Sequence, residues 1–272
     1  IELDEQPPLP HDSDALEISL TVSGMIGAHP VPLLQTMRKT VVDGSNTSGF
    51  QRTTLVATNG VLETEGGPVG IDVLCLEEDS ARKLDNNLTP DGEIVTWNLD
   101  RLGIPLIEIA TAPDVKSPDH AKQTSIALGR TLRDTRRVRR GLGSIRQDLN
   151  VSIMCGDRVE IKGCQDLDWI PKIIRCEMAR QLHFYRLANQ LRSNHGLPAL
   201  SNDRRVESPS VQEEVSQILQ LNLVDVSSAF QSCESKRVKS GLESNSIMLA
   251  LPLPGFAGLI GVKEFDADGA QM

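Results

Sequence analysis

The sequence lacks the features that would assign it to a membrane, to secretion or to zinc binding. No apolar run approaches the length of a membrane-spanning helix, and no basic-then-apolar leader is present. Its five cysteines form no Cys-x-x-Cys pair, and no His-x-x-x-His spacing indicates zinc. We therefore expect a cytoplasmic protein with reduced core thiols and no membrane contact.

The charge balance and the lack of a phosphate-binding loop add two limits. The 272 residues carry a formal net charge of −9, which argues against non-specific nucleic-acid binding by the chain as a whole. Any RNA contact must therefore use a local basic patch. No Walker loop occurs, so a nucleotide would have to bind by another mode.

Polar and apolar residues alternate between 143 and 164, which predicts two half-buried strands. If residues 155–157 are a three-residue loop, Asn150 lies opposite Lys162 and the apolar faces coincide. The apolar face holds Leu149, Val151, Ile153, Val159 and Ile161. The polar face suits either a solvated surface or a platform for phosphates and a metal.

The rest of the chain predicts a mixture of helices and strands. Ser13 or Asp14 can cap a helix that runs to about 27, and further helices are expected at 33–38, 117–137, 167–192 and 209–221. Strands are expected at 50–57, 61–64, 68–77, 93–98, 105–111 and 246–251. The pair Asn59-Gly60 is a hairpin-turn signal. Ser117 is predicted to cap a helix whose first residue is Pro118.

Five collinear stretches carry a family resemblance. They are MRKTVVDGSNTSGFQRT at 37–53, CLEEDSARK at 75–83, LDRLGIPLIEIATAPDVKSP at 99–118, GSIRQDLNVSI with RVEIKG at 143–163, and IPKIIRCEMARQ at 170–181. Together they resemble the E subunit of the archaeal glutamyl-tRNA(Gln) amidotransferases, which is related to the bacterial B subunit. The loop DGSNTSGFQRT resembles the E type, since the B type has a different loop there.

The resemblance implies an α+β fold of mainly antiparallel sheets with flanking helices, related to the glutamine synthetase core. It implies a catalytic cradle domain at 1–200 without its N-terminal part and a connecting segment at 201–245. Residues 246–272 would begin a truncated insertion domain similar to one in aspartyl-tRNA synthetases. We expect an internal piece that is inactive alone, because a preceding segment contributes metal ligands in the relatives.

The function implied is that of a carbon–nitrogen ligase with glutamine as amide donor. ATP and Mg²⁺ would serve to phosphorylate the glutamate of Glu-tRNA(Gln), and ammonia from an asparaginase-like D subunit would complete Gln-tRNA(Gln). Two D and two E subunits would form a heterotetramer. The alternatives are a bacterial B-type protein, a glutamine-synthetase-like ligase for a small amino acid, and a non-catalytic RNA-binding piece.

Acidic residues at the end of one predicted strand are candidate metal ligands. Neighbouring strand residues point to opposite faces, so Glu77 and Glu78 cannot both enter one site. Acids at a strand end are usually solvated, but the matching pair in the bacterial B-type relatives binds the catalytic metal. We prefer Glu78, since Val73, Cys75 and Glu77 share a face that mixes with the core.

Two further acids complete the expected site. Glu108 stands among apolar residues, which is costly for a carboxylate unless it binds a metal or pairs with a base such as Arg101. In the family the matching residue is a metal ligand, and Asp148 matches an acid of the B-type relatives. The predicted catalytic residues are Glu78, Glu108 and Asp148, and with Glu77 they are the predicted metal ligands.

Basic residues fall into three groups, each with two interpretations. Arg146, Arg158 and Lys162 would hold ATP phosphates or pair with Asp148 and Glu160 across the strands. The loop containing Ser45 is a turn or an anion cradle; the resemblance places Lys39, Ser45 and Arg52 near the tRNA acceptor end or the ammonia path. The last group, which offsets a helix dipole or contacts tRNA phosphates, is Arg136, Arg137, Arg139 and Arg140.

Overall fold

The computed structural model describes residues 9–89, 92–141, 143–202, 213, 223–253 and 255–257. The chain divides into two units, Ile1–Asp148 with Lys162–Lys172, and Leu149–Ile161 with Ile173–Met272. The expected domain bounds at 200 and 245 stay predictions. The helix expected at 209–221 lies outside the described residues.

The first unit is built on a five-stranded sheet in which every pair of neighbours is antiparallel. Its order is β1-β3-β4-β7, and β2 also pairs with β3. The strands are β1 (His29–Pro30), β2 (Thr36–Thr40), β3 (Phe50–Leu62), β4 (Val69–Glu78) and β7 (Pro105–Thr111). The expected α+β class with antiparallel sheets is confirmed.

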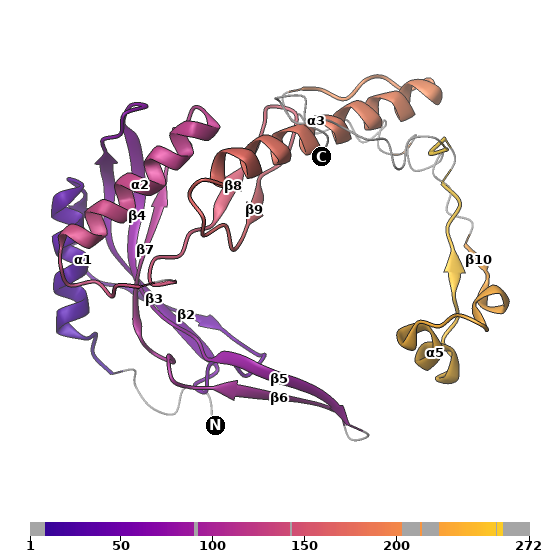
Figure 1. Cartoon of the computed structure of the whole chain (residues 1–272), viewed down its shortest axis with the longest axis horizontal. Coiled ribbons are helices and arrows are strands. Elements are labelled where there is room, and N and C mark those ends of the chain that lie inside the picture. Colours follow the sequence, from indigo (N-terminus) through magenta and orange to yellow (C-terminus); the bar gives the residue numbers. More distant parts are fainter. Residues whose placement is uncertain are drawn as a thin grey trace. The chain divides into compact units, whose positions relative to one another are not determined.

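Two helices, α1 (Ser13–Met25) and α2 (Pro118–Asp134), lie against one face of this sheet (Figure 1). Their apolar side chains enclose the core with fully buried residues of β3 and β4. Core members include Ala15, Val22, Val56, Leu74 and Leu76, with Ala127 and Leu128 packed against them. On β4 the even-numbered residues near the strand's end therefore face the helices.

The helix starts follow from capping chemistry. Ser117 accepts a hydrogen bond from the His120 backbone N–H at 3.1 Å, and Pro118 opens α2, as the sequence predicts. The cap of α1 is Asp12, which accepts from the Ala15 N–H at 2.8 Å. The sequence points to Ser13 or Asp14, so that prediction is wrong by one or two residues.

Two local predictions around β2 and β3 are wrong. Residues 36–40 form a strand where a helix at 33–38 was expected, and β3 runs straight through Asn59-Gly60. Asn59 takes a left-handed φ of 57° within the strand. Gly60 packs so closely on the segment after α1 that an added Cβ would lie 3.0 Å from the Ala28 Cβ. Tertiary packing, and not a turn, explains this Asn-Gly pair.

A two-stranded hairpin, β5 (Arg82–Thr89) with β6 (Gly92–Asn98), extends away from the sheet (Figure 1). The prediction of strands at 93–98 and 105–111 is confirmed by β6 and β7. Strand β5 was not expected, because most of its side chains are polar. They do not alternate between polar and apolar along the strand. Nearly all of its residues are exposed, so only pairing with β6 defines it.

The second unit contains a short hairpin, β8 (Leu149–Val151) with β9 (Val159–Ile161), and most of helix α3 (Ile170–Asn194). Asn150 lies opposite Glu160, so the expected pairing with Lys162 is wrong and the loop covers 152–158. The apolar faces still coincide because the shift is an even number of residues.

A glutamine of α3 explains the longer loop. The Gln181 amide donates to the Val151 carbonyl at 3.1 Å and accepts from the Ile153 N–H at 3.1 Å. These bonds satisfy backbone groups of Val151 and Ile153 that would otherwise pair with a neighbouring strand, so β8 ends at Val151. Farther along the second unit are β10 (Val224–Asp225), η1 (Ser227–Phe230), α5 (Lys236–Glu243) and β11 (Leu249–Ala250).

Candidate functional site

The end of β4 carries three consecutive acids, and each one contacts a different cation. Glu77 pairs with Lys39, Glu78 with Arg52, and Asp79 with Arg101 and Arg146. All these residues belong to the first unit. The strand alternation therefore spreads negative charge to both faces of the sheet, and each carboxylate has its own counter-charge.

Glu77 lies on the face of the sheet that is turned away from the helices. It pairs across the ladder with Thr53, whose hydroxyl donates to the Glu77 carboxylate at 3.0 Å. Lys39 of β2 contacts the same oxygen. Lys39 and Thr53 come from neighbouring strands, so the ladder itself assembles this polar group.

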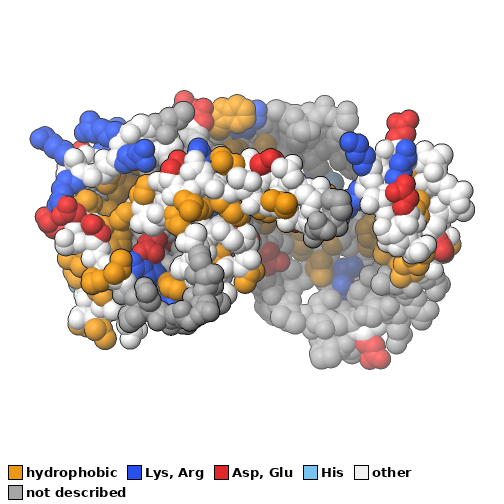
Figure 2. Space-filling view, turned by 90° about the horizontal axis from the view of Figure 1, so that it is seen from below, with side chains coloured by type: hydrophobic (Ala, Val, Ile, Leu, Met, Phe, Trp, Pro, Cys, Tyr) orange, Lys and Arg blue, Asp and Glu red, His pale blue; other side chains and the backbone are white. Residues whose placement is uncertain are grey.

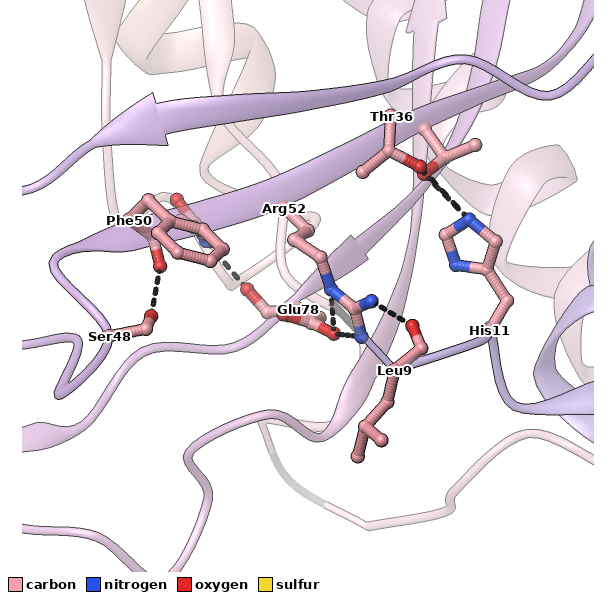
Figure 3. Close-up of polar contacts among 9 residues, drawn as sticks. Leu9, His11, Thr36, Ser48, Phe50, Arg52 and Glu78 are labelled. Atoms are coloured by element: carbon pink, nitrogen blue, oxygen red, sulfur yellow. Dashed lines mark hydrogen bonds and ion pairs between the residues drawn. The ribbon is translucent and has the colours of Figure 1, made fainter. Parts of the chain in front are cut away.

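Glu78 points to the opposite, helix-covered face. Arg52 Nε donates to a Glu78 oxygen at 2.7 Å, a second guanidinium nitrogen contacts the same oxygen, and the third donates to the Leu9 carbonyl (Figure 3). The Gln51 amide donates to the Glu78 carbonyl at 2.6 Å. These contacts use the Glu78 carboxylate as an anchor for Arg52.

The basis for preferring Glu78 over Glu77 does not separate the two residues, because Cys75 on the Glu77 face and Leu76 on the Glu78 face are both buried. That preference assumed that the face of Cys75 and Glu77 mixes with the core. The core cluster instead contains Leu74 and Leu76, so Glu78 shares its side of the strand with the core. Both residues remain predicted ligands, but Glu77 is the one that shares a face with Glu108.

Glu108 is exposed on β7, directly opposite Cys75 of β4. Burial raises the pKa of the Cys75 thiol, and the charges of Glu108 and Glu77 raise it further. Arg101 contacts Asp79 and not Glu108, and among the described residues no ion pair to Glu108 is observed. Glu108 and Glu77 thus approach the same thiol from two strands.

The fourth expected ligand, Asp148, pairs with Lys162, whose ammonium lies 3.2 Å from the carboxylate. Across the described ranges, no three His, Cys, Asp or Glu side chains cluster closely enough to hold a metal ion. Magnesium requires about six oxygen ligands. The described residues therefore do not complete a magnesium site, although Glu77 and Glu108 share a face.

Of the expected phosphate ligands, Arg146 and Lys162 each contact a carboxylate. Arg146 Nη2 lies 3.3 Å from Asp79, and Lys162 pairs with Asp148. Pairing of Lys162 with Asp148 was the structural alternative for that lysine, and it is observed. Arg158 is exposed just before β9 in the second unit.

The loop at 43–49 is pinned by its own hydrogen bonds. The Ser45 backbone N–H donates to Asp43 at 2.9 Å, and hydrogen bonds from Ser45 hold the pKa of Asp43 below its usual value. Ser45 is buried, its carbonyl accepts from the Ala81 N–H at 2.8 Å, and its hydroxyl faces Asn46. The contacts observed for Ser45 are therefore those of a structural loop residue.

The four arginines of the basic cluster all follow the end of α2 at Asp134. The helix was expected to extend to 137, so it ends earlier than predicted and leaves Arg136 and Arg137 outside it. Arg137 contacts Asp14 at 3.6 Å and Glu17 at 2.7 Å, so it links the segment after α2 to α1. Basic and acidic side chains adjoin one another on the face drawn in Figure 2. Arg137 therefore has a structural partner, while the cluster's contact with tRNA stays a prediction.

Sequence reasoning missed Asp79 and gave Arg101 only as a possible partner of Glu108. The signal for Asp79 was its position as the third acid of the run EED. A residue just past the strand end is free of the strict alternation that governs Glu77 and Glu78. Its backbone bonds to 103–104 then turn it toward the segment that carries Arg101.

No helix in the described part of the chain is long and apolar enough to cross a membrane. The chain matches the family model of the GatB/GatE catalytic domain over residues 4–243. It is also similar to proteins named as the E subunit of glutamyl-tRNA(Gln) amidotransferase. That of Methanocaldococcus jannaschii is 45% identical over 262 residues, and that of Pyrococcus furiosus is 45% identical over 261.

The corresponding protein of Methanothermobacter thermautotrophicus is 46% identical over 263 residues. The three alignments cover 96%, 96% and 97% of this chain but only 38% of each relative. The chain thus spans about 38% of the length of the curated relatives that it matches.

Proposed function

Because this chain belongs to the GatB/GatE catalytic domain family, we propose that it is part of the E subunit of a glutamyl-tRNA(Gln) amidotransferase. The observation that carries this is its similarity, over nearly its whole length, to relatives that bear that name. The presence of two carboxylates and a lysine on the face of one sheet that is turned away from the helices supports it.

The proposed reaction has two steps. An oxygen of the glutamate γ-carboxylate of Glu-tRNA(Gln) attacks the γ-phosphorus of ATP, and the bond to ADP breaks. Ammonia then attacks the γ-carbon, inorganic phosphate leaves with the bonding electrons, and the nitrogen releases one proton to give the amide. A free carboxylate is a poor acyl donor because its leaving group would be an oxide, and phosphorylation removes that obstacle.

The residues of this chain would bind and orient the reacting groups. Lys39 lies beside Glu77, where it would limit the repulsion between that carboxylate and an anionic substrate. Arg52 offsets the charge of Glu78 on the other face of the sheet. Mg²⁺, when bound, would offset charge on the transferring phosphoryl group. Glu77 and Glu108 would supply two of its oxygen ligands, and waters, phosphate oxygens of ATP and further residues of the complete subunit would supply the others.

We also propose that the enzyme requires ATP and receives ammonia from an asparaginase-like D subunit, in a heterotetramer of two D and two E subunits. Its location would be cytoplasmic, and its core would be related to that of glutamine synthetase. The chain alone is proposed to be inactive, since it spans about 38% of its relatives.

The test uses the full-length protein together with its amide-hydrolysing D subunit. Glu108→Gln should reduce ATP-dependent formation of Gln-tRNA(Gln) by about 100-fold or more, as loss of a charge-stabilising group does in other enzymes. Amide hydrolysis in the D subunit should be unchanged. Glu93→Gln, on the exposed β6 strand, is the matched control. Near wild-type amidation by Glu108→Gln would remove Glu108 from the site.

A further inference from the structure

Asp79 is held in place by both its backbone and its side chain. Its N–H donates to the Ile104 carbonyl at 2.8 Å, and its carbonyl accepts from the Gly103 N–H at 2.9 Å. One carboxylate oxygen accepts from the Ser80 N–H at 3.0 Å. Only 15% of the side chain is exposed. Asp79 is therefore a rigid anchor at the end of β4.

Two guanidinium groups converge on the other carboxylate oxygen. Arg146 Nη2 lies 3.3 Å and Arg101 Nε 3.9 Å from Asp79 Oδ2. Arg101 Nε also donates to the Ser80 carbonyl at 2.9 Å. The arginines come from segments 45 positions apart in sequence, 146 minus 101, so only the fold brings them together.

This arrangement leaves a local excess of positive charge and unused donors. One carboxylate offsets one of two guanidinium charges. Each guanidinium has five N–H donors, and the contacts above involve one nitrogen of each. Both side chains are more than a third exposed, so a solute can reach them. A pair of planar forks with spare donors matches the several oxygens of a phosphate group.

We propose that Asp79 is a positioning residue that holds Arg101 and Arg146 together as a binding site for a phosphate chain. This deepens the proposed function, on which it rests for the identity of the ligand as ATP. Asp79 does not contact the phosphate; it fixes the two arginines that do. A structural ion pair, which is the common role of such groups, is the competing explanation.

The binding test uses tripolyphosphate and the full-length protein, so its outcome does not depend on turnover. Arg101→Gln and Arg146→Gln should each weaken tripolyphosphate binding about 10-fold, the value of one charge-assisted hydrogen bond. Arg101→Lys should also weaken binding, because it keeps the charge but loses the fork. Calorimetry gives the dissociation constants.

The sign of the Asp79→Asn effect separates positioning from simple electrostatics. Removal of a negative charge beside an anion site should by itself tighten binding. We expect the opposite, weaker tripolyphosphate binding, since the arginines lose their shared anchor. In the Arg101→Gln/Arg146→Gln background, Asp79→Asn should have no further effect. Asp114→Asn, which removes a carboxylate that accepts from the Gly70 N–H at the far end of β4, is the matched control.

Tighter binding by Asp79→Asn, or unchanged binding in Arg101→Gln, Arg146→Gln and Asp79→Asn, would overturn the proposal. A lower melting temperature with unchanged binding would assign Asp79 a structural role only. Failure of the proposed function would look different. The wild-type enzyme would then bind tripolyphosphate through these arginines without forming Gln-tRNA(Gln). In the active enzyme the same variants should raise the KM for ATP more than they lower kcat.

Discussion

Glu108 of β7 faces Cys75 of β4 directly across the ladder, and the charge of Glu108 contributes to the raised pKa of that thiol. Buried thiols are usually inert packing groups. Here Cys75 reports on the carboxylates around it, because both Glu108 and Glu77 disfavour its thiolate. The pair therefore allows the geometry of the candidate site to be tested without any activity.

The first prediction concerns this thiol. Glu108→Gln should lower the pKa of Cys75, since one of the negative charges that oppose its ionisation is removed. The measurement is the pH dependence of iodoacetamide labelling of the Cys75 peptide by mass spectrometry. Cys164, whose raised pKa comes from burial and Asp166, is the internal control. An unshifted Cys75 profile would mean that Glu108 is not beside it.

The second prediction separates Glu77 from Glu78. Glu78→Gln should lower the free energy of unfolding by about 1–3 kcal/mol, because it leaves the largely buried Arg52 without its counter-charge. Glu77→Gln should mainly reduce amidation, since Lys39 is exposed enough to be hydrated. Urea unfolding and specific activity should be measured on both. If Glu78→Gln mainly reduced amidation and Glu77→Gln mainly reduced stability, Glu78 would be the better candidate for the metal ligand.

The third prediction concerns the basic cluster after α2. Arg139→Gln with Arg140→Gln should flatten the dependence of log tRNA affinity on log salt by about 0.7–0.9 for each lost phosphate contact. Arg137→Gln should instead lower stability, by less than about 1 kcal/mol, because its ion pairs with Asp14 and Glu17 are exposed. An unchanged salt slope in the double variant would exclude both arginines as phosphate contacts.

The fourth prediction follows from a buried carboxylate of α3. Glu177 is only 8% exposed, and two hydrogen bonds of 2.7 Å from Arg180 hold its pKa below the usual value. A lowered folded-state pKa stabilises the protein above the ordinary pKa of about 4.3, and this stabilisation is lost as the pH falls through the folded value.

Wild type should therefore lose more unfolding free energy than Glu177→Gln when the pH falls from about 5 to about 3. At neutral pH the variant should be less stable by about 1–2 kcal/mol. Urea denaturation at several pH values measures both effects. Parallel curves for the two proteins would show that Glu177 does not link stability to pH.

The fifth prediction tests the contact between the β8–β9 loop and α3. A Cβ at Gly156 would lie 2.1 Å from the Gln181 side-chain oxygen, which already accepts from the Ile153 N–H. Gly156→Ala should cost about 1–3 kcal/mol. Gly24→Ala, on a helix with open space around the position, should be neutral or stabilising by up to about 1 kcal/mol. Equal stability of the two variants would contradict the close contact.

Much of the local structure could be predicted because it depends on neighbouring residues. The Ser117-Pro118 cap, the strand of Glu108 and the apolar face of the 149–161 hairpin follow from capping chemistry and from period-two alternation. Strand β5 could not be predicted, since its polar side chains bury almost nothing. Its conformation comes from hydrogen bonds to β6 and not from the conformational preferences of its own residues.

Strand alternation alone places Glu77 and Glu78 on opposite faces, because alternation is a property of any strand. Which face each residue occupies depends on the side of the sheet that α1 and α2 cover, so this could be learned from the folded structure and not from the local pattern. In the same way, the apolar pattern required an even shift in the β8–β9 register, while Gln181 of α3 selected the longer loop. Alternation is local, but burial is set by elements that are distant in the sequence.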